Sequence, residues 1–94
     1  MPTVTRLTDA QVQQELEKRA GWELQEGAIK KLYKFKDFLE AIAFANRVAG
    51  LAEADDHHPD ILIRYNKVTL TLATHSAGGL TEKDFRLARM IDTP

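Results

Sequence analysis

Two short runs rich in β-branched residues, ILIRY at 61–65 and VTLTLAT at 68–74, are separated only by Asn66 and Lys67. This pattern is typical of a β-hairpin with a two-residue turn, in which asparagine suits a position with positive φ. So short a turn fixes which residues of the two strands face one another. The sequence therefore predicts an antiparallel sheet with a defined register.

The expected register pairs apolar residues on one face of the hairpin: Tyr65 with Val68, Ile63 with Leu70, and Ile61 with Leu72. Extended outward, it places Asp60 opposite Ala73 and His58 opposite His75 on the other face, where opposed Cβ atoms lie about 4.5–5.5 Å apart. Pro59 cannot donate to a ladder, so regular pairing is expected to end just before the histidines. A pair of nearby histidines is predicted at this end of the hairpin.

Three segments carry the signals of helix starts: TDAQ at 8–11, DFLE at 37–40 and TEKD at 81–84. Each places a capping side chain three residues before a residue that can return the hydrogen bond. Apolar residues at helical spacing follow each segment. We expect helices over about 9–20, from 38 to about 52, and over about 82–92.

GWEL at 21–24 and IKKLYKF at 29–35, separated by the turn-like QEG, predict a second hairpin. The order of elements becomes α-β-β-α-β-β-α. The economical packing is an α+β fold, with three helices on one face of a four-stranded antiparallel sheet. With 94 residues, the chain is expected to form a single domain over residues 1–94.

Charge and composition exclude several classes of function. The 13 Lys+Arg and 14 Asp+Glu give a net charge of −1, without the basic footprint that direct nucleic-acid binding requires. The lack of cysteine excludes disulfide frameworks, Cys-ligated zinc and thiol nucleophiles. The start of the sequence has no apolar signal region, and no apolar run reaches the ~18–20 residues that cross a bilayer. We expect no membrane partner and, by default, a cytoplasmic protein.

The three histidines are the candidate functional residues. EADDHHPDI at 53–61 holds His57 and His58, and THSAGGLT at 74–81 holds His75. A metal site is disfavoured, because adjacent residues of an extended chain point to opposite sides and the spacing matches no known ligand frame. General acid–base chemistry suits imidazole, whose reference pKa is ~6.5. Histidines that merely decorate the surface are the remaining alternative.

Three neighbouring residues are candidates for supporting roles. Asp84 follows Thr81 by three residues, where a carboxylate stabilises a helix start, and it reaches the site only if the site abuts that helix. Glu53 is either solvated or orients an imidazole by accepting a ring proton. Pro59 is expected to act as a stiff corner that presents both histidines.

These segments resemble the pterin-4a-carbinolamine dehydratase family. The resemblance rests on EADDHHPDI, YNKV, THSAGGLTEKD and LARMID, with GW and FKDF before them, and it covers nearly the whole chain. The most specific part is HHP followed about sixteen residues later by TH and then by GL(S/T)xxD. The resemblance implies the same sheet with three helices on one face. It also implies dehydration of 4a-hydroxytetrahydropterin to quinonoid dihydropterin, which regenerates the pterin used by aromatic amino-acid hydroxylases.

The resemblance further implies dimers or tetramers and no metal or organic cofactor. Its active-site positions fall on His57, His58 and His75, with Glu53 and Asp84 as supporting candidates. Our hypothesis is that His57 and His75 share the acid and base roles while His58 holds the pterin.

One position departs from the family pattern: the family commonly has tryptophan where this chain has Ile61. The alternative function is a non-catalytic dimerisation or interaction module, acting as a transcription cofactor or an assembly factor. The complete set of histidines favours an enzyme.

Overall fold

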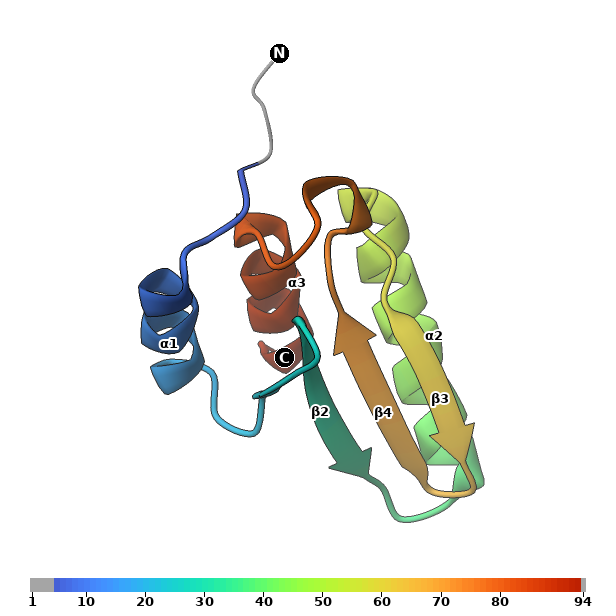
Figure 1. Ribbon diagram of the computed structural model, residues 1–94. Coiled ribbons are helices and arrows are strands. Elements are labelled where there is room, and N and C mark those ends of the chain that lie inside the picture. The colour runs from blue at the N-terminus through green and yellow to red at the C-terminus, as the bar shows by residue number, and fades with distance from the viewer. Residues whose placement is uncertain (1–4, 94) are drawn as a thin grey trace.

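The fold, seen in a computed structural model that describes residues 5–93, is the predicted α+β arrangement (Figure 1). Residues 1–4 and 94 of the expected domain lie outside the described residues. The described part contains three α-helices and four strands: α1 (Asp9–Glu17), β1 (Glu23–Gln25), β2 (Ala28–Lys34), α2 (Phe38–Asp55), β3 (Asp60–Arg64), β4 (Lys67–Leu72) and α3 (Glu82–Asp92). The strands form one antiparallel sheet in the order β1-β2-β4-β3.

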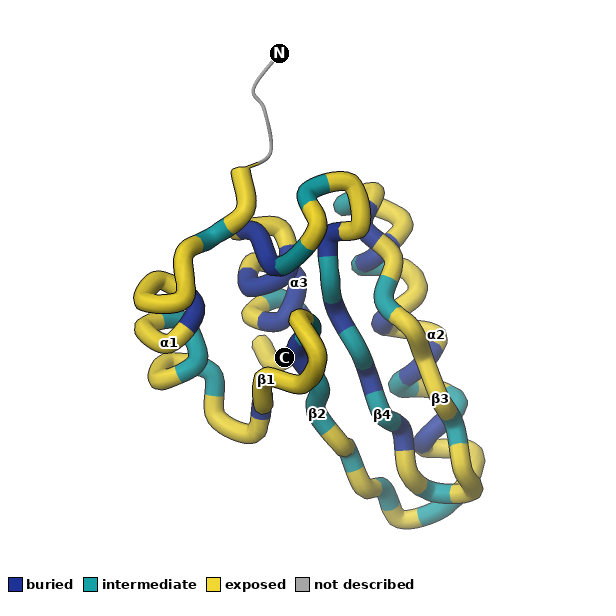
Figure 2. Tube along the Cα trace, viewed as in Figure 1, coloured by how far each residue is buried: buried dark blue, intermediate teal, exposed yellow. Residues whose placement is uncertain are grey.

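The core lies between the sheet and the helices. Along β4, every second side chain is buried, as the two-residue period of a strand requires. Figure 2 shows this alternation in β4 together with the buried positions of α2. The main buried apolar side chains are Ile29, Val48, Val68, Leu70, Leu72, Leu80, Phe85, Leu87 and Ile91. Among residues 5–93, no helix has both the length and the apolar character needed to cross a membrane.

The predicted helix starts are confirmed. Thr8 with Gln11, and Thr81 with Asp84, each form a reciprocal capping box. Asp37 accepts from the backbone N–H of Glu40 at 2.9 Å, whereas Glu40 accepts from Lys36. The first helix ends at Glu17, three residues earlier than predicted. After Glu17 the backbone N–H groups donate to carbonyls three residues earlier, as in a 3₁₀ turn, and Gly21 then takes a positive φ of 87°.

The predicted turn of the second hairpin is wrong by one position. Tyr65 and Asn66 form the turn, and Arg64 pairs with Lys67. Tyr65 has the positive φ, 53°, that was expected at Asn66. The cause is a contact with the first hairpin: the Asn66 side-chain amide donates to the carbonyl of Phe35 at 2.9 Å, and the Asn66 carbonyl accepts from the Phe35 N–H at 2.8 Å.

The register of the two strands is therefore shifted by two residues: Ile63 faces Val68, and Ile61 faces Leu70. Because side chains alternate with a period of two, this shift leaves every residue on its predicted face. Pairing stops at Asp60, as Pro59 predicts. His75 lies outside β4, at the start of a 3₁₀ helix (His75–Ala77), so the predicted ladder pair of His58 and His75 does not form.

Candidate active site

The two histidine segments meet at a contact between His57 and Asp84. α2 ends at Asp55, and the next residue, Asp56, takes the left-handed conformation. The chain turns there, so that the His57 N–H donates to the carbonyl of Ala52 at 3.1 Å. The ring Nε2 of His57 then lies 2.6 Å from Oδ1 of Asp84 in the first turn of α3. The two side chains are 10 % and 0 % exposed, so this pair is shielded from water.

The buried carboxylate of Asp84 is fully supplied with donors. Its Oδ2 accepts from the Thr74 hydroxyl at 2.8 Å and from the Thr81 backbone N–H at 2.9 Å. The Thr74 and Thr81 hydroxyls lie 2.8 Å apart. Since the Thr74 proton goes to Asp84, Thr81 is the donor in that pair. Asp84 therefore caps α3, as predicted. It also contacts His57, because the candidate site lies against the start of α3.

This network fixes the proton on one ring nitrogen of His57. Asp84 accepts two hydrogen bonds at Oδ2, and an ionised carboxylate has no proton to donate. The short contact at Oδ1 is therefore donated by the Nε2–H of His57, an assignment made from the hydrogen-bond network. Nδ1 is the nitrogen left to exchange a proton.

His58 is held more loosely than its neighbour. Its Nε2 lies 3.0 Å from Oε2 of Glu53, one turn back on α2, and both side chains are exposed. Of the two predicted alternatives for Glu53, solvation or contact with an imidazole, the structure has the contact. An exposed pair of this kind orients a ring but adds little stability. Pro59, half-buried, follows directly and leads into β3.

His75 is presented by a short closed loop. Thr74 and Gly79 close it with backbone hydrogen bonds of 3.0 and 3.4 Å. Gly78 takes a positive φ of 73°, which glycine adopts without steric cost, and its N–H donates to the carbonyl of His75. Among residues 5–93, no side chain bonds to the exposed ring of His75, so both of its nitrogens can meet a ligand.

His58 and His75 line one hollow, here called the histidine hollow, with a volume of about 380 Å³. That volume lies in the range of about 300–1,000 Å³ found for small-molecule sites. Thr71, Ala73 and Thr74 form part of its wall. His57 is not among the lining residues, but Thr74 links the wall to it through Asp84. No group of three or more metal-binding side chains gathers within residues 5–93.

Sequence reasoning missed the part played by Thr74. Thr74 directly precedes His75 in the sequence, but its contact with Asp84 depends on how the 74–79 loop leads the chain into the first turn of α3. Thr81 was recognised only as a helix cap. A buried threonine beside a histidine carries no local signal of such a contact.

Comparisons with known proteins agree on one family. The family model described as pterin 4 alpha carbinolamine dehydratase matches residues 5–93. A relative from Picosynechococcus sp. is 53 % identical over 88 residues, which cover 94 % of this chain and 96 % of the relative. A relative from Thermomicrobium roseum is 54 % identical over 88 residues, covering 94 % and 95 %. Both are named, provisionally, pterin-4-alpha-carbinolamine dehydratase.

Solved structures show the same fold. A transcriptional coactivator/pterin dehydratase from Brucella melitensis has a TM-score of 0.90 and 41 % identity, covering 94 % of this chain and 96 % of that one. A pterin dehydratase-like protein identified as a RuBisCO assembly factor in the alpha-carboxysome has a TM-score of 0.62 and 24 % identity, covering 76 % and 82 %. At 24 % identity, the second comparison shows only that the two proteins share a fold.

Proposed function

Since the chain belongs to the pterin 4 alpha carbinolamine dehydratase family, we propose that it converts a 4a-hydroxytetrahydropterin to a quinonoid dihydropterin and water. One observation carries the proposal. The Nε2 of His57 lies 2.6 Å from the buried Oδ1 of Asp84, and Thr74 links this pair to the hollow that His58 and His75 line.

The reaction is an elimination that needs two proton transfers. An acid protonates the hydroxyl on C4a, the C4a–O bond breaks, and water leaves. A base removes the proton from N5, and the N–H electron pair becomes the new bond between N5 and C4a. No net oxidation occurs, so the step balances without a redox partner. One protonated and one neutral imidazole beside the ring supply what the step needs.

In our proposal, His57 and His75 share the acid and base roles. Asp84 accepts from the Nε2–H of His57 and fixes the orientation of the ring, as a carboxylate does for the histidine of a catalytic triad. The His57 side chain keeps 10 % of its surface exposed, which leaves an edge for proton exchange. Within residues 5–93, no side chain bonds to either ring nitrogen of His75. His58, oriented by Glu53, holds the pterin.

We further propose that the protein acts as a homo-oligomer, a homodimer or homotetramer, in tetrahydrobiopterin recycling in the cytoplasm, with an aromatic amino-acid hydroxylase in the same pathway. β3 is an edge strand whose outer side is unpaired within residues 5–93. Asp60 and Arg64 lie symmetrically about Leu62. Two copies of β3 paired antiparallel about Leu62 would set each Asp60 opposite Arg64 of the partner subunit.

The second candidate function is a non-catalytic interaction module. The 41 % identical protein from Brucella melitensis is described both as a transcriptional coactivator and as a pterin dehydratase. The test is to generate the 4a-hydroxypterin and follow its dehydration with and without the folded protein. We expect a rate that rises in proportion to protein concentration. If the protein leaves the spontaneous rate unchanged, the interaction module becomes the better account.

A further inference from the structure

An ion pair between Asp55 and Arg86, here called the Asp55–Arg86 bridge, joins α2 to α3 beside the contact of His57 with Asp84. Nη2 of Arg86 lies 2.6 Å from Oδ1 of Asp55. Asp55 stands two residues before His57, and Arg86 stands two residues after Asp84. Figure 1 shows the end of α2 and the start of α3 at the same end of the molecule. The same two short segments are therefore linked twice.

The charge of Asp55 is unfavourably placed for its own helix. Asp55 is the last residue of α2, where the free carbonyl groups favour a cation, and the last turn of α2 has no basic residue. Its side chain is only 7 % exposed, and a shielded charge is tolerated when a partner compensates it. Within residues 5–93, Arg86 is the only cation that forms an ion pair with Asp55. The local cost of Asp55 is thus offset by the contact with α3.

The bridge lies just before the turn that presents His57. Asp56, between Asp55 and His57, takes a left-handed φ of 49°. The bridge holds the residue before this turn, and Asp84 holds the ring of the residue after it. Two anchors, one on each side of the turn, restrict the place of the imidazole more than either anchor alone.

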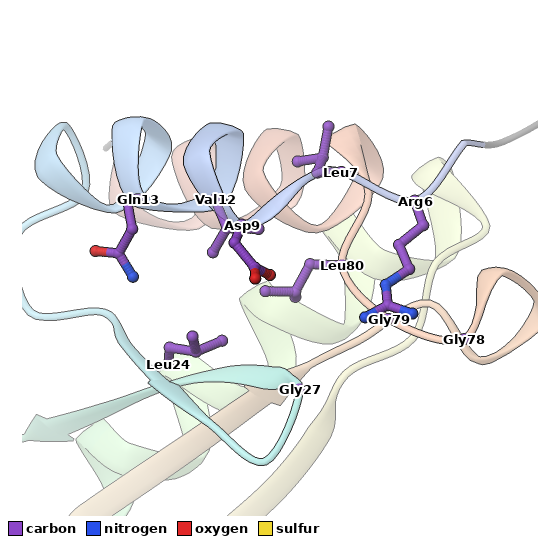
Figure 3. Close-up of a pocket in the computed structure, with 10 residues that line it drawn as sticks. All are labelled: Arg6, Leu7, Asp9, Val12, Gln13, Leu24, Gly27, Gly78, Gly79 and Leu80. Atoms are coloured by element: carbon purple, nitrogen blue, oxygen red, sulfur yellow. The ribbon is translucent and has the colours of Figure 1, made fainter.

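The bridge does not touch either hollow near the site. Neither Asp55 nor Arg86 lines the histidine hollow, and neither lines the hollow of about 440 Å³ between α1 and the β1–β2 turn that Figure 3 shows. The Arg86 side chain is 60 % exposed. An effect of the bridge on the reaction must therefore pass through the position of His57.

We propose that Arg86 is a positioning residue for proton transfer: through Asp55 it holds the end of α2 where the ring of His57 meets both Asp84 and the substrate. The inference rests on the proposed function. A group that transfers a proton must lie within hydrogen-bond reach of its partner atom, so a small displacement of the ring lowers the rate. Loss of the bridge should lower kcat at an unchanged KM, because Arg86 does not contact the histidine hollow.

The first test compares Arg86→Ala, Arg86→Lys and Arg89→Ala. A displacement of 1 Å costs about 10²-fold, and the ring of His57 keeps its bond to Asp84, so we expect kcat of Arg86→Ala to fall about tenfold. Arg86→Lys keeps the charge and should recover most of that loss. Arg89, on the same helix, forms no ion pair within residues 5–93, so Arg89→Ala is the matched control and should keep the wild-type values. An undiminished kcat in Arg86→Ala, or equal losses in Arg86→Ala and Arg89→Ala, would overturn the inference.

Exchanging the two charges gives a second test. Arg86→Asp alone sets two carboxylates against each other and should lower kcat more than Arg86→Ala does. Asp55→Arg/Arg86→Asp restores opposite charges and places a cation at the end of α2, as the helix dipole favours. We expect the double variant to regain most of the lost kcat. A double variant that has the wild-type circular dichroism spectrum but is no faster than Arg86→Asp would contradict the inference.

A measurement on the His57 ring separates this inference from the proposed function. The Nε2–H of His57 is shielded and bonded to Asp84, so proton NMR can follow its exchange with water without any substrate. We expect this exchange to be about tenfold faster in Arg86→Ala than in wild type or Arg89→Ala, because loss of the bridge eases local opening. The Trp22 indole N–H, bonded to Asp92, is the internal reference and should exchange alike in all three proteins, since only global opening would accelerate both protons.

The two measurements together tell the two failures apart. If the wild type dehydrates no carbinolamine but His57 exchanges faster in Arg86→Ala alone, the proposed function fails and the placement of His57 by Arg86 stands. If the wild type is active and the ring proton exchanges alike in all three proteins, only the further inference fails.

Discussion

At the scale of single residues, the candidate site depends on one carboxylate with two tasks. Asp84 accepts from the Thr81 N–H at the start of α3 and from the ring of His57 at the end of α2. A buried charge is tolerated only when donors surround it, and Thr74 supplies the third. The same residue therefore stabilises the fold and orients an imidazole.

Replacing Asp84 should cost both stability and activity. In Asp84→Ala the Thr81 N–H and the His57 ring proton lose their acceptor, so we expect the free energy of unfolding to fall by about 3 kcal/mol. Urea unfolding measures this loss. Glu82→Ala removes an exposed acid from the same helical turn and should cost at most about 1 kcal/mol. Similar losses in the two variants would show that Asp84 acts only through the charge of the helix end.

At the scale of elements, β2 is tied to the end of α3 by Asp92. Its carboxylate accepts from Tyr33 at 2.5 Å, from the Trp22 indole at 2.8 Å and from Lys31 at 3.1 Å. Burial is the largest cause that raises the pKa of Tyr33 above its usual range, followed by the hydrogen bond to Asp92 and by the charge of that residue, whereas the charge of Arg47 lowers it.

The raised pKa of Tyr33 predicts a loss of stability in alkali. Above pH ~10 the unfolded chain releases the phenolic proton, whereas the folded protein retains it. The stability that Tyr33 contributes is thus complete below pH ~10 and is lost as the pH rises further. Tyr33→Phe has no such proton. The difference in free energy of unfolding between wild type and Tyr33→Phe should therefore shrink between about pH 9 and 11, and a constant difference would contradict this account.

The elements also show what could be predicted from the sequence. Caps were predictable because a residue such as Thr81 bonds within its own turn. The hairpin register was not, because Asn66 is held by Phe35, which belongs to another hairpin. The predicted meeting of the two histidine segments was right in outline, since His58 and His75 line one hollow. Its route was wrong, since Asp84 and the 74–79 loop bring the segments together and the ladder does not.

At the scale of the whole molecule, the outer edge of β3, which is unpaired within residues 5–93, predicts a dimer. If two copies pair about Leu62, Arg64→Asp sets Asp60 against a second acid across the interface and should weaken association. The double variant Asp60→Arg/Arg64→Asp restores opposite charges and should recover it. Light scattering coupled to size exclusion measures the mass of each. A monomeric wild type, or a double variant no better than the single one, would contradict pairing through β3.

The central claim at this scale is that the fold assembles a proton-transfer site from the segment before β3 and the segment after β4. The most direct measurement is kcat for dehydration of the 4a-hydroxypterin by wild type and His75→Ala. A positioned acid or base typically contributes 10²–10⁴-fold, so we expect kcat of His75→Ala to fall by about that factor with an unchanged circular dichroism spectrum. Ser76→Ala, the exposed neighbour in the same loop, should keep the wild-type rate. A folded His75→Ala protein with undiminished kcat would contradict the account.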